Sequence, residues 1–416
     1  MTPIDFSRRY RFDSRIVDGS YFSGAPLALE PGDVVGVVLL NLGGPHRRDD
    51  VEPFLYNLFM DPAIIDIPLK GMTRHLLCRL ISSLRAKKVA TDYARIDPEG
   101  GSPINRLTEA QAGALQRELS ERFGAPNGVT FTTVVAMRYW HPFSEEADAA
   151  MREAGVTKVI LLPLYPHYSK TTTGASLVYW KALEENGEIP TRPTTYVKEY
   201  AAHPRYLRAL SDRIDEGLAR FPEAIRPGVR LLFSAHGTPA KEMIERNDPY
   251  CCLIHSTVDR LMKGRGEDRP FGVSFQSKVG PAEWLKPSTV ETVRELGAKG
   301  EKALLVIPIA FVTDHIETAF ELDMEVREIA HHAGIEEYGV TGGLNDHPEF
   351  IAALAETAAA QLTIGGRSLT ADVPAWPERP LYPESGRQVR CASCRCATEA
   401  RIWHDAPSAH EPTLST

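Results

Sequence analysis

Short apolar runs rich in β-branched residues alternate with longer stretches of helical periodicity along most of the chain. Each run is bounded by glycine, proline or polar turn residues, a pattern typical of buried strands joined by helices in a parallel sheet. The pattern predicts an α/β fold. The eight strands are expected at residues 34–44, 130–139, 158–166, 194–200, 230–237, 270–277, 303–311 and 337–343.

The eight predicted strands form two sets of four that resemble each other. LLPLYP at residue 161 corresponds to VIPIAF at residue 306, an offset of 145, and His203-Pro204 corresponds to His347-Pro348, an offset of 144. A constant offset between similar segments indicates a duplicated unit. We therefore predict two similar Rossmann-like halves, each a four-stranded parallel sheet flanked by helices, with a cleft between them at the carboxyl ends of the strands.

The first half is longer than the second between its first two strands. The first strands end at Gly43 and Gly237, which are 194 residues apart, 49 more than the offset of 145. The additional residues lie within 46–105, a segment rich in apolar residues. They form either a lid or lip over the cleft or helices that cover the hydrophobic core of the first half. The expected organisation is an N-terminal arm (1–33), a first half (34–200), a second half (201–345), a C-terminal helix packed on the core (346–365) and a flexible cysteine-containing tail (366–416).

Composition and charge narrow the class of protein. The 416 residues are 43% hydrophobic and 25% charged, the balance of a globular chain. A net charge of −8 lacks the basic footprint of nucleic-acid binding, so no nucleic-acid partner is expected. The longest uncharged apolar stretch, 303–312, is about half of the roughly 20 residues that a membrane helix needs. The start lacks a secretory apolar region, so we expect a cytoplasmic protein, with peripheral contact at the inner face of the membrane left open.

His236 follows a predicted strand in the motif SAHGTP. The strand brings this histidine to the ligand edge of the sheet, where an imidazole with a pKa near neutrality can act as a general base or a metal ligand. The alternative is a histidine that only forms hydrogen bonds within its turn.

Three carboxylates follow the strand at 303–311 with a spacing of four residues. Glu317, Glu321 and Glu325 fall on one face of a helix, with Asp314 and His315 at its start. Like charges at this spacing destabilise a helix by only a few tenths of a kcal/mol per pair, so a solvated acidic face is one explanation. At the ligand edge of a buried sheet, the same oxygen ladder attracts a divalent cation such as Fe²⁺ and can pass it along.

An arginine and several aromatic residues lie at other strand ends. RYWHPF contains Arg138 and Tyr139, YPHYS contains Tyr165, and PAEWL contains Trp284. An arginine beside aromatic residues can bind the carboxylate of a large flat ligand that stacks on the rings. The alternative is a set of ordinary core aromatics with a surface arginine.

Together, several motifs resemble those of the ferrochelatases, the enzymes that insert Fe²⁺ into a porphyrin at the end of haem synthesis. They occur in order across about residues 34 to 350 and are NLGGP, GGSPI, RYWHP, LLPLYPHYS, SAHGTP, FQSKVGPAEWLKP and PIAFVTDHIET. The resemblance implies the same chelatase-type fold that the offsets predict independently. It also implies a lyase whose substrates are Fe²⁺ and a porphyrin, with protoporphyrin IX favoured, and which releases two protons.

The same resemblance implies roles for individual residues. His236 matches the family's active-site histidine, and Glu317 matches its catalytic acid. The implied metal ligands are His236, Glu317, Glu321, Glu325 and Asp314, with Glu321 and Glu325 on the acidic path of a distorted helix. The implied porphyrin contacts are Leu42, Arg138, Tyr139, Tyr165, Trp284, Phe311 and His315.

The six cysteines are too few for a disulfide scaffold but pose a specific question. A [2Fe–2S] cluster, which some family members carry, needs four ligands. The candidates are Cys391, Cys394 and Cys396 with either Cys251 or Cys252. Two departures oppose this hypothesis, because Lys170 replaces a cluster cysteine of the animal members and the C-terminal spacing is tighter than theirs. A tail without a cluster is the alternative.

Three other functions stay open at this point. One is a ferrochelatase specific for coproporphyrin III, and another is a sirohydrochlorin chelatase of the same fold. The third is a porphyrin or haem carrier without activity, which the intact His236 and Glu317 argue against. The sequence does not set the oligomeric state.

Overall fold

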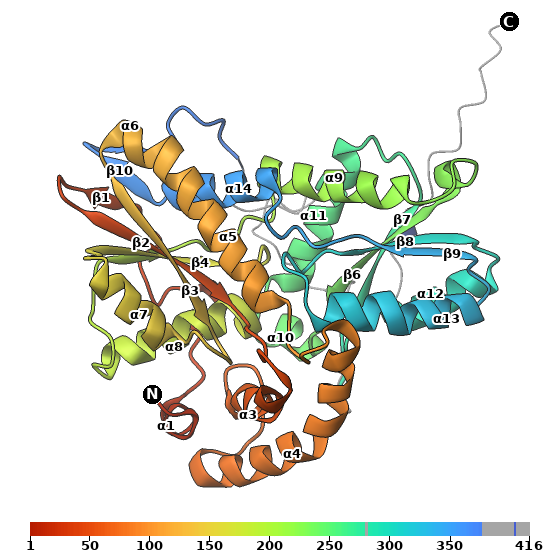
Figure 1. Ribbon diagram of the computed structural model, residues 1–416, viewed down its shortest axis with the longest axis horizontal. Coiled ribbons are helices and arrows are strands. Elements are labelled where there is room, and N and C mark those ends of the chain that lie inside the picture. The colour runs from red at the N-terminus through yellow and green to blue at the C-terminus, as the bar shows by residue number, and fades with distance from the viewer. Residues whose placement is uncertain (279–281, 377–402, 405–416) are drawn as a thin grey trace, which may run out of the picture. The chain divides into compact units, whose positions relative to one another are not determined.

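A computed structural model describes residues 1–278, 282–376 and 403–404 of the chain (Figure 1). The chain divides into two compact units. The first contains Met1–Tyr206, Val312–Phe320 and the segment that starts at Leu344, and the second contains Leu207–Phe311 and Glu321–Gly343. The helix α9 (Pro204–Ala219) begins in the first unit and ends in the second.

The first unit is built on a four-stranded parallel sheet. Its strands are β2 (Val34–Asn41), β3 (Thr130–Met137), β4 (Lys158–Pro163) and β5 (Thr194–Tyr196), in the order β3-β2-β4-β5. Val38 of β2 lies opposite Val134 on one side and Leu161 on the other. All four strands lie where the apolar runs predict them.

The second unit repeats this arrangement. Its parallel strands are β6 (Arg230–His236), β7 (Phe271–Gln276), β8 (Ala303–Pro308) and β9 (Glu337–Val340), in the order β7-β6-β8-β9. The two sheets share one strand order, which confirms the predicted pair of similar four-stranded halves. One addition is β12 (Trp403–His404), a short antiparallel strand beside β7.

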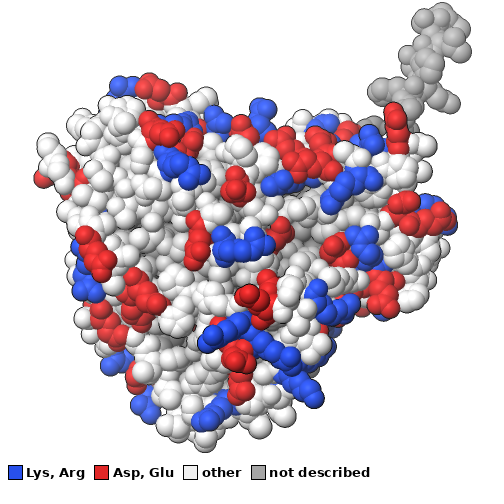
Figure 2. Space-filling model, viewed as in Figure 1, with Lys and Arg blue, Asp and Glu red and all other residues white. Residues whose placement is uncertain are grey.

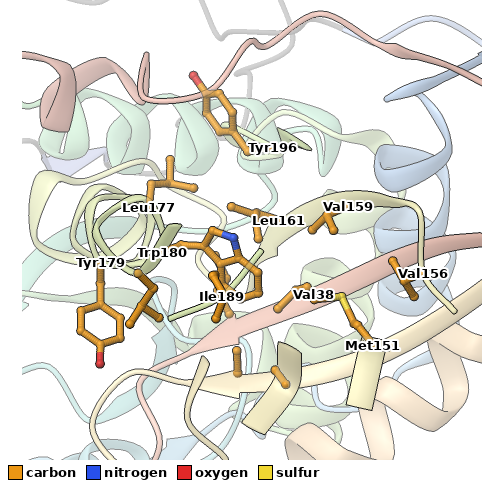
Figure 3. Packing of buried hydrophobic residues seen from close by; sticks show 14 of the residues in the cluster. Val38, Met151, Val156, Val159, Leu161, Leu177, Tyr179, Trp180, Ile189 and Tyr196 are labelled. Atoms are coloured by element: carbon orange, nitrogen blue, oxygen red, sulfur yellow. The ribbon is translucent and has the colours of Figure 1, made fainter. Parts of the chain in front are cut away.

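Helices cover the faces of both sheets, because strands that are buried on both sides need apolar cover. Around the first sheet lie α5 (Ile104–Leu119), α7 (Ser144–Glu153), α8 (Ala175–Glu185) and α14 (Pro348–Ala359). Around the second lie α10 (Ala240–Ile244), α11 (Tyr250–Gly264), α12 (Thr289–Ala298) and α13 (Val326–His332). Figure 3 shows the first core, in which Trp180 of α8 lies near Leu161, Val38 and Ile189.

Residues 46–105, which we call the insertion, fold into two main helices. They are α3 (Val51–Met60) and α4 (Gly71–Ile96), preceded by a 3₁₀ turn, η1 (Arg48–Asp50). Phe54 and Leu55 of α3 form a cluster with Tyr93 of α4 and with Tyr139, which follows β3. The insertion therefore packs on the carboxyl end of β3.

The N-terminal arm and the end of the described chain add structure that the sequence pattern does not predict. The strands β1 (Leu27–Leu29), β10 (Leu362–Ile364) and β11 (Arg367–Ser368) form a small separate sheet. Two helices of the arm, α1 (Pro3–Arg9) and α2 (Arg15–Asp18), bury Phe6 and Ile16. The remaining short elements are η2 (Ser120–Gly124), α6 (Ala125–Asn127), η3 (Lys170–Gly174), η4 (Arg226–Gly228) and η5 (Glu317–Glu325).

A single buried arginine holds the loop between α3 and α4. The guanidinium of Arg74 donates five hydrogen bonds, of 2.8–3.2 Å, to the carbonyl oxygens of residues 59, 60, 61, 65 and 67. Its side chain is fully buried, and this burial lowers the pKa of Arg74. The carbonyls at the end of α3 lack helical partners, so Arg74 acts as their cap.

Replacing Arg74 with alanine is expected to lower the free energy of unfolding by about 3 kcal/mol, because charged donors contribute ~1.5–3 kcal/mol and buried carbonyls lose their partners. Urea denaturation measures this change. Arg79→Ala is the matched control, because Arg79 is exposed on the same helix and its loss should change stability by at most ~0.5 kcal/mol. Equal stability of the two variants would contradict the capping role.

Candidate functional site

His236 is the last residue of β6 and lies beside Gln276 at the end of β7. The next residue, Gly237, has no room for a side chain, because a Cβ there would lie 2.7 Å from the Gln276 carbonyl oxygen and 3.1 Å from the Trp284 ring. The backbone N–H of Leu285 donates to Thr238 at 3.0 Å, which fixes the Trp284 segment along this turn. The predicted residues His236 and Trp284 are thus close together in the second unit.

Two aromatic side chains complete the surroundings of His236. The Phe311 ring lies edge-on to the imidazole, with 6.1 Å between ring centres. The Tyr250 hydroxyl donates to the His236 carbonyl at 3.0 Å. Phe311 was predicted as a porphyrin contact, whereas Tyr250 was missed. The signal for Tyr250 is weak, since it is only the first residue of a helix after the turn residues Asp248 and Pro249.

A buried polar network lies in the strands next to this histidine. Ser234 of β6 donates to the Gln276 side chain at 2.7 Å and lies 2.9 Å from the Thr289 hydroxyl, which in turn lies 2.9 Å from Ser274 of β7. Because each of these buried groups has a partner, the network specifies one register of β6 against β7. That register determines the position of His236 at the end of β6.

His315 and Glu317 belong to the segment Val312–Phe320 of the first unit. The His315 Nδ1 lies 3.1 Å from the Thr313 carbonyl oxygen, and a carbonyl only accepts hydrogen bonds. Nδ1 therefore carries a proton, and the other ring nitrogen, Nε2, lies 3.8 Å from the Glu317 carboxylate. Glu317 is 16% exposed. This histidine is thus positioned to exchange a proton with Glu317.

Hydrogen bonds to two other segments anchor this one. The Thr313 hydroxyl donates at 3.0 Å to Gln111 of α5, which in turn donates at 2.9 Å to the Asn345 carbonyl. Both oxygens of Asp314 accept hydrogen bonds, from the Thr318 hydroxyl at 3.1 Å and the Asn345 side chain at 2.8 Å. Asp314, predicted as a metal ligand, also anchors this segment through these hydrogen bonds. Gln111 and Asn345 were missed, because their contacts span up to 234 residues.

The three predicted carboxylates lie along one π-helix, η5, rather than an α-helix. Glu325 is exposed, whereas Glu321 and Glu317 are partly buried. The Ser277 hydroxyl donates to Glu321 at 2.7 Å from a backbone with φ of 63°, a strained conformation of the kind found at functional sites. π-Helical turns are likewise common at such sites. Within the described residues, no three histidine, cysteine or acidic side chains converge into a metal-binding group.

The end of β3 brings the remaining predicted contacts of the first unit together. Arg138 and Tyr139 both bind Asp61 of the insertion, at 2.7 Å and 2.9 Å. Leu42, which follows β2, packs in the same apolar cluster as Tyr139. Tyr165 follows β4, and burial raises its pKa. Asp61 is another residue that the sequence pattern missed.

Comparison with known proteins bears on what these residues do. A family model described as Ferrochelatase matches residues 34–362. The chain belongs to the ferrochelatase family. Among curated ferrochelatases, the one from Synechococcus sp. (strain RCC307) is 43% identical over 84% of this chain and 88% of its own length. The ferrochelatase from Gloeobacter violaceus is 41% identical over 80% of this chain and 99% of its own length.

Ferrochelatases are metal chelatases of haem biosynthesis whose substrates are ferrous iron and a porphyrin, and this chain is an enzyme of that class. Among solved structures, SirB from Bacillus subtilis with Fe³⁺ is 12% identical, with a TM-score of 0.45, over 78% of this chain and 96% of its own. That similarity is too low to bear on the activity. No helix in the described ranges is long and apolar enough to cross a membrane.

The five candidate cluster cysteines fall in two groups. Cys251 and Cys252 lie near the start of α11, and their exposed fractions are 0% and 7%. Cys391, Cys394 and Cys396 lie outside the described residues. The described part of this ferrochelatase therefore does not by itself provide the four thiolates of a [2Fe–2S] cluster.

Proposed function

We propose that this ferrochelatase inserts Fe²⁺ into protoporphyrin IX, with His236 and Glu317 as the groups that accept the two pyrrole protons. Insertion exchanges two N–H bonds of the macrocycle for bonds to iron, so two protons leave in each turnover. The single observation that carries the assignment is the position of the His315 Nε2, 3.8 Å from the Glu317 carboxylate. A proton that Glu317 accepts has a neighbouring base to receive it.

The proposed iron path follows η5. Exposed Glu325 meets the hydrated ion first, Glu321 binds it next, and Glu317 brings it to the porphyrin. Carboxylate oxygens at successive positions replace water ligands one at a time, which lowers the cost of dehydration. A path of single carboxylates holds the ion weakly, as a substrate that must be released requires. His236 and Asp314 remain predicted metal ligands.

The proposed porphyrin contacts are aromatic and apolar side chains at the strand ends. Leu42, Tyr139 and Tyr165 follow three strands of the first sheet, and Phe311 and Trp284 surround His236 in the second unit. Flat rings of this kind stack on a macrocycle. Arg138 and His315 complete the predicted set.

Replacing His236 with alanine is expected to reduce kcat by about 100-fold or more, the usual contribution of a general base. The assay is anaerobic metallation with Fe²⁺ or Zn²⁺, with protoporphyrin IX and coproporphyrin III run in parallel. His332→Ala is the control, because His332 is exposed in the same unit. Unchanged turnover in H236A would overturn the mechanism, and faster turnover of coproporphyrin III would reassign the substrate. Porphyrin binding without metallation would identify a carrier.

The cluster remains a prediction, with Cys391, Cys394, Cys396 and either Cys251 or Cys252 as ligands, and no step above depends on it. A bound [2Fe–2S] centre produces thiolate-to-iron bands in the visible spectrum of the untreated protein. Cys394→Ser should remove such bands. A featureless spectrum of protein purified under anaerobic conditions would exclude the cluster.

We also infer that the insertion contacts the inner face of the membrane, with the enzyme in the cytoplasm. In the described part of the chain, six large apolar side chains are strongly exposed, and four of them lie on α4. They are Met72, Leu76, Leu80 and Leu84, which are 51–73% exposed. A spacing of four residues aligns them on one face of the helix.

Charge supports an anionic lipid surface as the partner of this face. Although the chain has a net charge of −8, α4 has Asp92 as its one acidic residue. Figure 2 shows lysine and arginine gathered at the lower right, where Figure 1 places α4. The exposed basic residues on and next to it are Lys70, Arg79, Arg85, Lys87, Lys88 and Arg95. A basic helix with an exposed apolar face is typical of binding at a membrane interface, and the cytoplasmic leaflet is anionic.

The enzyme is expected to float with vesicles that contain phosphatidylglycerol but not with vesicles of phosphatidylcholine alone, because the basic side chains need anionic headgroups. Leu80→Glu should abolish flotation. Ile244→Glu is the control, since Ile244 is 55% exposed in the second unit. Equal flotation of L80E and the wild type would overturn the membrane contact.

A further inference from the structure

Asp61 is a buried carboxylate at the point where the insertion meets the first sheet. It is the C-cap residue of α3, and its side chain is 1% exposed. One oxygen, Oδ1, accepts the backbone N–H of Ala63 at 2.8 Å. The backbone carbonyl of Asp61 accepts a hydrogen bond from Arg74 at 3.0 Å. Oδ1 and the backbone carbonyl of Asp61 are therefore both bonded within the insertion.

The second oxygen, Oδ2, bonds to two residues that follow β3. It accepts the Tyr139 hydroxyl at 2.9 Å and lies 2.7 Å from Nη2 of Arg138. Asn57 of α3 makes a further bond in the same place, donating to the Tyr139 carbonyl at 3.1 Å. The end of α3 is thus held to the strand end by one ion pair and two hydrogen bonds.

Asp61 is the carboxylate in direct contact with Arg138, and Glu145 is a more distant anion that also raises the pKa of this arginine. Its side chain is 10% exposed and lies over the Tyr179 ring at 3.8 Å and over Phe6 at 5.1 Å. Burial lowers the pKa of Arg138, but Asp61, Tyr139, Tyr179 and Glu145 together outweigh this effect, and the pKa is raised. Its Nε is buried without a hydrogen-bond partner. Removing the Asp61 charge would leave this buried cation without a carboxylate in direct contact, which disfavours the packing of α3 against the end of β3.

A cavity of about 500 Å³ in the first unit adjoins this ion pair. Its walls include Asp61, Arg138, Tyr179, Phe6 and Asn57. The end of α3 and the arginine side chain therefore have space to move into when the ion pair breaks. A tightly packed wall would not allow such a movement.

We propose that Asp61 is a positioning residue that fastens the insertion to the carboxyl end of β3 and so fixes the apolar surface offered to the porphyrin. The inference rests on the proposed porphyrin site, because its kinetic consequence depends on Leu42 and Tyr139 facing the substrate. The ion pair also affects the predicted substrate contact of Arg138, because a substrate carboxylate that binds this arginine shares it with Asp61.

A buried cysteine can report whether α3 stays in contact with the end of β3. Cys78 of α4 is fully buried, and its thiol lies 3.2 Å from the carbonyl oxygen of Phe59, two residues before Asp61. Burial raises the pKa of this thiol, which further slows its reaction with thiol reagents. If α3 moves away from the strand end, Cys78 becomes accessible. Mass spectrometry of labelled peptides separates its reaction from that of the other cysteines.

Asp61→Asn is expected to raise the rate of maleimide labelling at Cys78 by about tenfold or more and KM for the porphyrin by about fivefold, with kcat within about threefold of the wild type. Tyr139→Phe keeps the ion pair but loses one hydrogen bond, so both quantities should rise less. Asp49→Asn is the matched control, because Asp49 is an exposed carboxylate of the insertion. All labelling is done well below the thermal midpoint of each variant, which excludes unfolding as the cause.

Unchanged labelling of Cys78 in both D61N and Y139F would overturn the fastening. Faster labelling with an unchanged KM would overturn the positioning role. A lower KM in D61N would also overturn it, since that result means that Asp61 competes with the substrate for Arg138. The labelling result does not need turnover, so failure of the proposed porphyrin chemistry can be distinguished from failure of the fastening.

Discussion

Parallel pairing of β6 with its neighbours is the constraint on which the proposed chemistry depends. Parallel strands end at the same edge of their sheet, so residues that follow different strands collect there. His236 ends β6, Gln276 ends β7, and Phe311 follows β8 by three residues. The buried bonds of Ser234 and Thr289 specify the register, and a shift by one residue would turn His236 to the opposite face.

Proton transfer requires that the histidine ring present the correct nitrogen to its partner, as well as lie close to it. The Thr313 carbonyl determines that Nδ1 of His315 carries the proton, and Gln111 holds the Thr313 hydroxyl. The orientation of Nε2 toward Glu317 is therefore a consequence of hydrogen bonds made by α5, far away in the sequence. Such supporting contacts often determine whether a general acid or base is correctly oriented.

Sequence patterns predicted the features that are determined by residues close together in the chain. The eight strands are confirmed because buried parallel strands read as continuous apolar runs, and the shared strand order of the two sheets agrees with the constant offset. His236 could be singled out because it ends a strand, and Glu317 because it begins the carboxylate series in the segment after β8. The spacing of Glu317, Glu321 and Glu325 also predicted their common helix, but not its π-helical form, which no periodicity of four residues specifies.

Other features depend on contacts between distant segments and leave no periodic signal. Asp61 meets Tyr139 across 78 residues, and β1 pairs with β10 over only three residues, Leu27 opposite Leu362. Arg138 shows most clearly what the local pattern leaves out. A strand-end arginine beside aromatics fits a substrate carboxylate, yet its nearest anion is a carboxylate of the protein itself.

Single-turnover metallation by Glu317→Gln, measured beside porphyrin binding by fluorescence quenching, tests the central claim most directly. Glutamine keeps the size and hydrogen bonding of the side chain but cannot accept a proton. The proposed role predicts porphyrin binding within about threefold of the wild type and a metallation rate lower by about 100-fold or more. Metallation at the wild-type rate would contradict it.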